Sequence, residues 1–433
     1  MERGQGVDAV NRFLAHARQF VGGPLDAHTV VHVVMGNEAS DLDSMVSSTM
    51  HAYHRSVSPL AGAITAGKTH SYVPVINIPR QDFALRTESV WLFESVGVDT
   101  RSWVFIDEID LDALHERGQL RLVLIDHNKL ASHQKHLADA VEEIVDHHNN
   151  EHLYASSVVR RVVEPVGSAA TLVALELLEA HSDDASAVVL DAGLARLLMG
   201  PILLDTVNFA ADSARFNEKD TRAYEALKQI IAAAGEGEGQ SPQALFDKLQ
   251  AEKFNVASLS SRDLLRKDYK EFHLHISGGK RSVKLGISSV GQSIEAWAAN
   301  ESDIPAALAK WFAEQGLDLL LANTAFFDQQ KDQFVNDVKQ FIATSNKSSD
   351  VPDDGLSFCR QLVAFVEAAE GDANAQLFAE LVGFLEKNQE LKLHRTASEV
   401  TQGRRVVFYD QGNAKVSRKV LEPILAQQFF ASL

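Results

Sequence analysis

The chain has one cysteine among its 433 residues, Cys359, and it lacks any long uninterrupted run of apolar residues. A single cysteine excludes a disulfide within the chain and fits a reducing compartment, so we expect a cytoplasmic location. No stretch approaches the roughly 18 consecutive apolar residues of a membrane-spanning helix, and the opening MERGQGVDAV lacks the apolar core of a signal peptide. No membrane partner is therefore expected.

Positive charge is also scarce. The chain has 41 lysines and arginines against 59 aspartates and glutamates, a formal net charge of −18. This balance disfavours a broad face that follows a nucleic-acid backbone, so no nucleic-acid partner is expected. An anion can still bind where metal ions or a local cluster of cations reverse the field. At ~150 residues per domain, the length predicts two or three domains.

The first half of the chain alternates between short apolar runs and amphipathic stretches. Apolar residues at helical spacing predict an opening helix over 7–20. Strands are predicted at 30–35, 73–78, 103–106, 120–125 and 143–145, and helices at 42–55, 83–96, 168–180 and 185–198. This alternation predicts an α/β domain with a mostly parallel sheet over residues 1–231.

The pattern changes after a small, polar, glycine-rich stretch at 232–243, which predicts a linker. Strands are predicted beyond it at 272–276, 283–290, 317–323 and 406–410, together with three or four helices and a loop at 345–355. Residues 244–433 therefore predict a second, smaller α+β domain.

Acidic residues and histidines follow four of the apolar runs. They are Gly36-Asn37-Glu38-Ala39-Ser40-Asp41-Leu42-Asp43-Ser44 after 30–35, Asp126-His127-Asn128 after 122–125, Asp146-His147-His148-Asn149 after 144–145, and Asp205-Thr206-Val207-Asn208 after 202–204. Ligands of an open α/β sheet collect outside the carboxyl ends of its strands. We interpret all four runs as strand ends, and this predicts one cluster: Asp41, Asp43, Asp126, His147, His148 and Asp205.

So many carboxylates in one place would repel one another unless cations neutralised them. Carboxylates with one or two imidazoles suit hard divalent ions such as Mg²⁺ and Mn²⁺. Two ions ~3.5–4 Å apart can hold the attacking and leaving oxygens of a phosphoryl transfer. For each motif alone a structural role is the alternative: Ser40-x-x-Asp43 has the pattern of a capping box, and the chain holds 17 histidines.

The four motifs together resemble the DHH phosphoesterase superfamily, whose name matches Asp146-His147-His148. The first motif, GNEASDLDS, resembles those of exopolyphosphatases and of prune-type phosphodiesterases. Family II inorganic pyrophosphatases carry histidine where this chain has Asn37, and prune-type proteins typically carry DHR where this chain has DHH. Asparagine in the first motif together with DHH in the third resembles exopolyphosphatases most. The segments 85–88 and 166–171 are also similar to the superfamily.

The resemblance implies two metal positions. Asn37 and Asp41 would face one ion, Asp43, His147 and Asp205 would face the other, and Asp126 would bridge both. His148 would contact substrate phosphate, and it is with Asp126 an expected catalytic residue. An amide oxygen is a harder and weaker ligand than imidazole, so we expect two or more Mg²⁺ ions, with Mn²⁺ or Co²⁺ as substitutes.

Two neighbours of these residues have outer roles. Asp146 is expected to hold an imidazole in one tautomer. His127 has a similar role or a plain structural one.

The second domain offers two basic clusters for an anionic substrate, within residues 266–272 and at Ser417-Arg418-Lys419. The latter precedes a predicted helix at 420–430, where free backbone N–H groups and cations can point the same way. The alternative is a plain N-cap by Ser417 with solvated neighbours. The resemblance implies that Lys270, Arg418 and Lys419 contact phosphate, and it leaves Arg266 and Lys267 open.

Taken together, the resemblance implies a metal-dependent hydrolase that releases terminal orthophosphate from inorganic polyphosphate, with its site in the cleft between the domains. The alternatives are an inorganic pyrophosphatase, a prune-type cyclic-nucleotide phosphodiesterase, and a regulatory binding protein that has lost the chemistry. No expected ligand position holds an apolar residue, which disfavours the last of these. The sequence predicts no oligomeric state.

Overall fold

The computed structural model describes residues 6–183, 188–210, 215–235, 241–257, 259–276, 281–327, 358–401 and 403–433. Its contacts divide the chain into two compact units, Met1–Lys253 and Phe254–Leu433. The division falls at the end of α8 (Pro242–Phe254), between Lys253 and Phe254, and the predicted linker is at 232–243, of which residues 236–240 lie outside the described part. The predicted loop at 345–355 also lies outside it.

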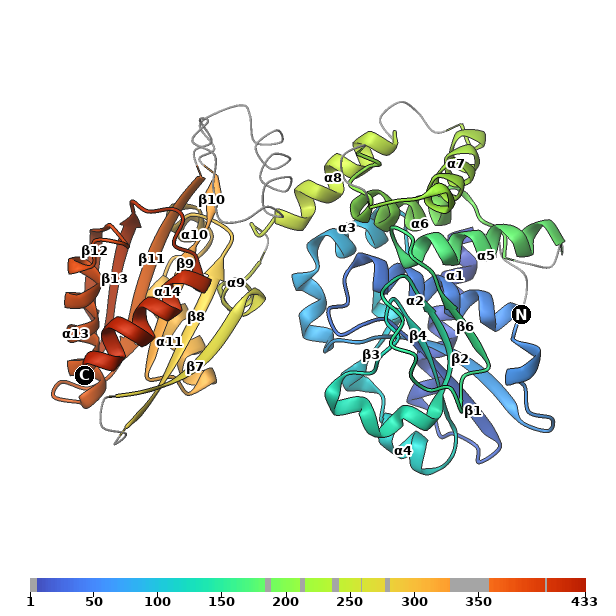
Figure 1. Ribbon diagram of the computed structural model, residues 1–433, viewed down its shortest axis with the longest axis horizontal. Helices are drawn as coiled ribbons and strands as arrows, with labels where there is room; N and C mark the ends of the chain where they lie inside the picture. The colour runs from blue at the N-terminus through green and yellow to red at the C-terminus, as the bar shows by residue number, and fades with distance from the viewer. Residues whose placement is uncertain are drawn as a thin grey trace. The chain divides into compact units, whose positions relative to one another are not determined.

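The first unit contains a six-stranded sheet in which every neighbouring pair is parallel (Figure 1). The strands are β1 (Thr29–Met35), β2 (Thr69–Ile76), β3 (Val104–Phe105), β4 (Leu120–Ile125), β5 (Val141–Asp146) and β6 (Arg160–Val163). The helices are α1 (Gly6–Gly22), α2 (Leu42–Val57), α3 (Thr87–Ser95), α4 (Leu111–Glu116), α5 (Ala169–Asp183), α6 (Ala192–Asp205), α7 (Glu218–Ala233) and α8 (Pro242–Phe254). The predicted parallel α/β domain is confirmed.

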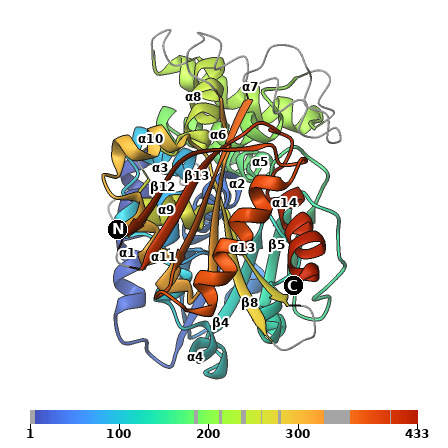
Figure 2. The ribbon, with the colours of Figure 1, turned by 90° about the vertical axis from the view of Figure 1, so that its left-hand side faces the viewer.

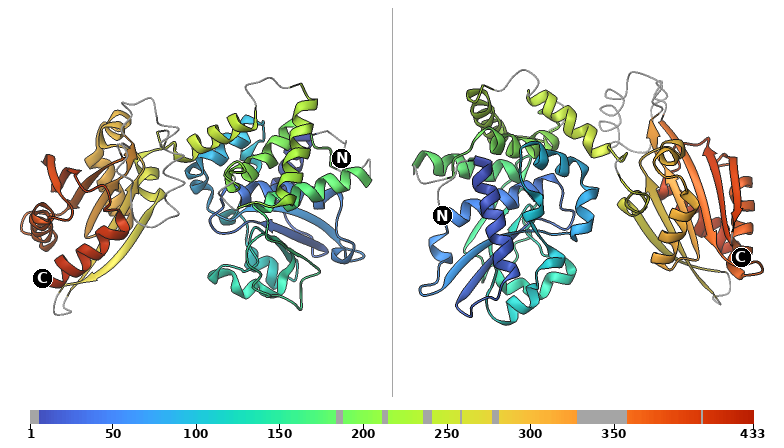
Figure 3. Two further views of the ribbon diagram at one scale, coloured as in Figure 1. Left: turned by 45° about the horizontal axis from the view of Figure 1, so that its top comes forward. Right: turned by 180° about the vertical axis from the view of Figure 1, so that it is seen from behind.

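The sheet forms because its central strands are apolar on both faces. All seven residues of β1 are buried; Val34 belongs to the core on one face, while Val31 and Val33 belong to the core on the other. Helices must cover both faces of such a strand. α2, α5 and α6 pack on one face, α4 packs on the other, and α1 contacts β2 and β3 (Figure 3).

The strand order is β3-β2-β1-β4-β5-β6, so the direction of winding reverses between β1 and β4. A crevice forms at such a reversal, outside the carboxyl ends of the strands, and ligands of doubly wound sheets bind there. The first motif follows β1, Asp126 follows β4, and His147 follows β5. Three of the four motifs therefore meet at one end of the sheet by topology alone.

The prediction that residues 202–204 end a strand is wrong. They lie in the last turn of α6, and Asp205 is its final residue. The helix is buried over most of its surface, with Leu194, Leu198 and Ile202 among its core residues. An apolar run within a helix buried on all sides does not differ from a buried strand by periodicity.

The second unit contains a seven-stranded mixed sheet in the order β12-β13-β11-β9-β8-β7, with β10 paired to β11. Among the strands of the described residues, only β8 and β9 are parallel neighbours. The strands are β7 (Tyr269–His275), β8 (Ser282–Val290), β9 (Leu319–Thr324), β10 (Phe326–Phe327), β11 (Phe358–Glu367), β12 (Leu393–Thr401) and β13 (Arg404–Gln411). The predicted α+β character is confirmed, although the sequence analysis did not find β10, β11 and β12.

Helices cover both faces of this sheet. They are α9 (Ser261–Lys267), α10 (Ile294–Asn300), α11 (Ile304–Gln315), α13 (Ala373–Lys387) and α14 (Arg418–Ile424). Figure 2 shows α13 and α14 in front of the strands. On the opposite face, Phe312 of α11 packs edge-on against Phe365 of β11, with ring centroids 5.6 Å apart.

Candidate active site

The loop between β1 and α2 carries the first motif. Asp41 caps α2, because its Oδ1 accepts the N–H of Ser44 at 3.1 Å. The amide oxygen of Asn37 accepts the N–H groups of Ala39 and Ser40 at 2.8 and 3.2 Å. Asn37 is thus the turn residue of this loop, and its amide nitrogen faces β4. Gly36 is required here, because a Cβ atom at that position would lie 2.5 Å from the Cβ of Ser44.

Asp126 stands at the centre of the site, directly after β4. Its Oδ2 accepts the hydroxyl of Ser44 at 2.7 Å and the amide of Asn37 at 2.9 Å. Its Oδ1 lies 3.1 Å from Nε2 of His147. Its φ of +62° is left-handed, which is uncommon for a residue with a side chain and is typical of positions under functional constraint. The backbone thus turns the carboxylate into the crevice.

Asp43, in the first turn of α2, is buried and directed at the start of α5. Its carboxylate accepts the backbone N–H groups of Ala169 and Ala170 at 2.6 and 2.8 Å, and the hydroxyl of Ser47 at 2.8 Å. The N-terminus of α5 therefore stabilises this negative charge. Oδ2 of Asp43 lies 3.8 Å from Nε2 of His147.

The end of β5 fixes two imidazoles by different means. Nδ1 of His147 lies 3.0 Å from the carbonyl oxygen of Val166, which directs Nε2 toward Asp43 and Asp126. Asp146 is fully buried, and its Oδ1 lies 2.8 Å from Nδ1 of His148. Asp146 therefore holds an imidazole as expected, namely that of His148. The side chain of His148 is 57% exposed, so it can reach a ligand in solvent.

The carboxylates of the site act on one another electrostatically. Burial and the charges of Asp43 and Asp41 outweigh the hydrogen bonds from His147 and Ser44, and together they raise the pKa of Asp126 to about 7. Burial, followed by the charges of Asp43, Asp41 and Asp126, raises the pKa of Asp205 well above its usual range. Asp205, at the end of α6, therefore lies within the electrostatic influence of these three carboxylates.

The same charges act on the histidines. Burial lowers the pKa of His147, but the hydrogen bond to Asp126 and the charges of Asp43 and Asp126 outweigh it and raise the pKa to about 10. The hydrogen bond to Asp146 raises the pKa of His148. Burial lowers the pKa of His127, whose Nδ1 lies 2.9 Å from the carbonyl oxygen of Ile125.

The donor set fits hard divalent cations. Ligand atoms of Asp126, His147 and His148 lie within 4.8 Å of one another, and Asp43 and Asp205 interact with them electrostatically. A cation would relieve the repulsion that raises the pKa values of these carboxyl groups. Carboxylates with one or two imidazoles match Mg²⁺ or Mn²⁺ rather than a soft metal.

Two residues outside the predicted site hold the loop between β1 and α2 by hydrogen bonds. Nδ2 of Asn77, just after β2, donates to the carbonyl oxygen of Gly36 at 3.0 Å. Arg86 donates from Nε and Nη2 to the carbonyl oxygen of Ala39 at 2.9 and 2.6 Å. Arg86 lies in the segment 85–88, whose similarity to the superfamily was the available signal.

In the second unit, the two basic clusters meet through an ion pair. Nη2 of Arg418 lies 2.6 Å from Oδ1 of Asp268, two residues before Lys270. Ser417 precedes α14, but its side chain makes no capping hydrogen bond, so the plain N-cap alternative lacks its defining contact. Lys270 and Lys419 are exposed. Arg266 is paired with Asp263 at 2.7 Å.

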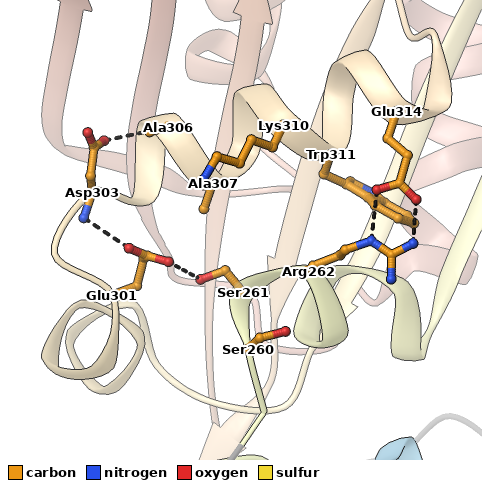
Figure 4. Close-up of a pocket in the computed structure, with 10 residues that line it drawn as sticks. All are labelled: Ser260, Ser261, Arg262, Glu301, Asp303, Ala306, Ala307, Lys310, Trp311 and Glu314. Carbon is orange, nitrogen blue, oxygen red and sulfur yellow. Dashed lines mark hydrogen bonds and ion pairs between the residues drawn. The ribbon is translucent and has the colours of Figure 1, made fainter. Parts of the chain in front are cut away.

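A pocket of about 460 Å³ beside α9 and α11 is a different kind of site (Figure 4). Its acidic side chains outnumber its basic ones. Arg262 is paired with Glu314 at 2.5 Å, and Glu301 accepts the hydroxyl of Ser261 at 2.9 Å. Excess negative charge disfavours a phosphate ligand, and no predicted site residue lines this pocket.

A parallel α/β sheet with carboxylates and imidazoles clustered at its switch point defines the class of the first unit, a metal-binding α/β protein. Two family models match the chain: the DHH family, N-terminal domain, over residues 32–202, and the DHHA2 domain over residues 247–428. The chain belongs to the DHH family, and the predicted resemblance is confirmed.

Curated relatives support this assignment along the whole chain. The chain is 31% identical over 403 residues to Exopolyphosphatase PRUNE1 of Mus musculus, covering 93% of this chain and 76% of that protein. It is 32% identical to the protein of the same name from Bos taurus, with the same coverage. It is 25% identical to the Manganese-dependent inorganic pyrophosphatase of Methanothrix thermoacetophila, over 48% of this chain and 61% of that protein. Among the described residues, no helix is both long and apolar enough to cross a membrane.

Proposed function

We propose that the chain is an exopolyphosphatase that hydrolyses terminal orthophosphate from inorganic polyphosphate. The observation that carries this proposal is the position of the buried carboxylates of Asp43 and Asp126 against Nε2 of His147 at the switch point of the sheet, with Asp205 close enough for their charges to raise its pKa. The family assignment and the names of the mouse and bovine relatives support the choice of substrate. The single cysteine supports a cytoplasmic location.

Two or more divalent cations, Mg²⁺ in the first place, bind at the cluster. The residues that would hold them are Asn37, Asp41, Asp43, Asp126, His147 and Asp205. Bound divalent cations would supply positive charge to phosphate oxygens and acidify a water molecule. The chemistry of the donors supports a hard divalent cation. The manganese dependence in the name of the Methanothrix relative supports a divalent cation and Mn²⁺ as a substitute.

Hydrogen bonds within the protein orient the side chains of Asp126 and His147. Ser44 and Asn37 fix one oxygen of Asp126, so that the other faces His147. The carbonyl of Val166 holds the ring of His147 with Nε2 toward the carboxylates. Such preorganisation means that little reorganisation is needed when charge develops during the reaction.

The side chains proposed to bind substrate phosphate are those of His148, Lys270, Arg418 and Lys419. His148 keeps its ring anchored on Asp146 while most of its side chain remains exposed. Charge-assisted hydrogen bonds of this kind hold the equatorial and leaving oxygens of a transferred phosphoryl group.

Orthophosphate release from long-chain polyphosphate, pyrophosphate and cyclic AMP, measured side by side with Mg²⁺ and with Mn²⁺, tests the proposal. We expect release from polyphosphate to dominate. Faster release from pyrophosphate would indicate the activity named for the Methanothrix relative, and faster hydrolysis of cyclic AMP would indicate a phosphodiesterase. No release from any of the three would support a regulatory binding protein.

A further inference from the structure

A chain of buried polar side chains crosses the sheet of the second unit. Nη1 of Arg360, on β11, donates to Oδ1 of Asn323, on β9, at 2.8 Å. Nδ2 of Asn323 donates in turn to Oε1 of Gln411, on β13, at 3.1 Å. Asn323 is fully buried and Gln411 is 7% exposed. Three strands thus contribute one side chain each to a single network.

This network supports the segment that leads into Ser417. Nε of Arg360 donates to the carbonyl oxygen of Ala414 at 2.7 Å. Nε2 of Gln411 donates to the carbonyl oxygens of Asn413 and Val416, both at 2.8 Å. The guanidinium of Arg360 is therefore held in one orientation beside the basic cluster that begins at Arg418.

Arg360 is a half-buried cation whose hydrogen-bond partners are all neutral. Its partners are the amide of Asn323 and the carbonyl oxygens of Thr324 and Ala414, and no carboxylate of the described residues forms an ion pair with it. Burial lowers the pKa of Arg360 to about 10. Removing a charge from water without a counter-ion costs free energy, and a bound anion would offset this cost by its attraction to the guanidinium.

Strand register places Arg360 on the same face of the sheet as Lys270, one of the predicted phosphate contacts. Arg360 lies opposite Gln411, and Asn323 lies opposite Leu362, so these side chains share a face. Across β8 and β7 the same face includes Ser289 and Lys270. Tyr269, one position on, packs against Trp311 of α11 on the other face.

We infer that Arg360 binds a phosphate group of the polyphosphate chain distant from the one cleaved, an inference that rests on the proposed function. Three strand steps separate β7 from β11, or about 14 Å at the usual strand spacing. A distance of this size spans several linked phosphates. Arg360 is then a residue that favours long chains over pyrophosphate.

The full chain with Arg360→Gln tests this inference, and Arg405→Gln provides a matched control. Arg405 lies near the far end of β13, and its Nη1 also donates to neutral acceptors, the carbonyl oxygens of Ala368 and Gly403 at 2.7 and 3.4 Å. Loss of a charge-assisted contact should lower kcat/KM for long-chain polyphosphate roughly tenfold or more. Pyrophosphate kinetics should be unchanged, and Arg405→Gln should leave both substrates unchanged.

Arg360→Lys separates the effect of the positive charge from the effect of the hydrogen bonds that hold the segment before Ser417. Lysine keeps the charge, but it lacks the guanidinium group that donates to both Asn323 and Ala414. We expect it to recover most of the affinity for long chains. Equal losses on both substrates, or no recovery with lysine, would mean that Arg360 only supports the segment before Ser417. Unchanged long-chain kinetics in Arg360→Gln would also overturn the inference. If the wild-type chain releases no phosphate, calorimetric binding of long-chain polyphosphate in EDTA still compares the folded variants, so the two proposals can fail separately.

Discussion

Ser44 donates its hydroxyl hydrogen to Oδ2 of Asp126 across 2.7 Å, and both residues are almost completely buried. This contact joins the first turn of α2 to the residue after β4. Because Oδ2 is held there, Oδ1 is directed toward His147 at 3.1 Å. The first motif therefore orients the central carboxylate of the site as well as contributing its own.

Asp126→Asn should lower turnover by orders of magnitude, because it removes charge from the centre of the proposed metal cluster. The fold should tolerate the change. Asparagine is compatible with the left-handed backbone at φ +62°, and loss of a buried like charge relieves repulsion. Phosphate release at saturating Mg²⁺ and a thermal melt measure the two effects. Turnover close to that of the wild-type chain would contradict the two-metal assignment.

Ser44→Ala should weaken divalent-cation binding several-fold, since Asp126 would keep only Asn37 on Oδ2. The variant also loses the hydrogen bond that the Ser44 hydroxyl accepts from the backbone N–H of Asn37 at 3.1 Å, so each of the two lost bonds should cost about 1 kcal/mol of stability. Ser48→Ala is the matched control: Ser48 is equally buried on α2, but its hydroxyl donates to the carbonyl oxygen of Ser44 at 2.7 Å. Titration with Mn²⁺ compares the two variants. Equal affinity in both would limit Ser44 to a role in packing.

The parallel sheet and three of the four motifs could be predicted because each central strand is a continuous apolar run. For β4 the predicted and observed bounds coincide, so Asp126 was placed correctly at its end. The run at 202–204 failed because a helix buried on all sides has the same apolar signature. β12 is an exposed edge strand with one buried residue, so its sequence lacks the alternation of apolar and polar residues that would indicate a strand. The contacts of Asn77 and Arg86 join distant segments, which no local pattern reveals.

Asn37→His should shift metal preference from Mg²⁺ toward Mn²⁺, because imidazole binds transition metals better than an amide oxygen does. In the structure the amide oxygen of Asn37 accepts two backbone N–H groups, while its nitrogen donates to Asp126. Calorimetric titration of both proteins with each ion measures the ratio of affinities. A ratio that stays the same or falls would leave Asn37 as a turn residue only.

Arg418→Ala should lower kcat/KM for polyphosphate roughly ten- to a hundredfold, the effect of losing a charge-assisted hydrogen bond to phosphate. Metal affinity should not change, because no ligand is removed. Asp268→Asn is the control, since it breaks the 2.6 Å ion pair but keeps the cation. If both variants lose the same activity, the pair acts by holding α14 rather than by binding substrate.

His54 should make the first unit less stable as the pH falls from 6.5 toward 4. Burial, with the charges of His51 and Arg55, lowers its pKa to about 4 against the opposing charges of Glu176 and Glu143. In the unfolded chain the imidazole of His54 is protonated near pH 6.5, whereas in the folded chain it is protonated only near pH 4. Acid therefore favours unfolding. The contribution of His54 to the free energy of unfolding is fully present above pH 6.5, and about 2 kcal/mol of it is lost by pH 5.

Urea unfolding at pH 7.5 and 5.0 measures this change. The free energy of unfolding should fall less between the two pH values in His54→Gln than in the wild-type chain. The exposed His16 on α1 is the control, because His16→Gln should keep the full effect. The same pH dependence in His54→Gln and in the wild-type chain would show that His54 is protonated in the fold through its neighbours Glu176 and Glu143.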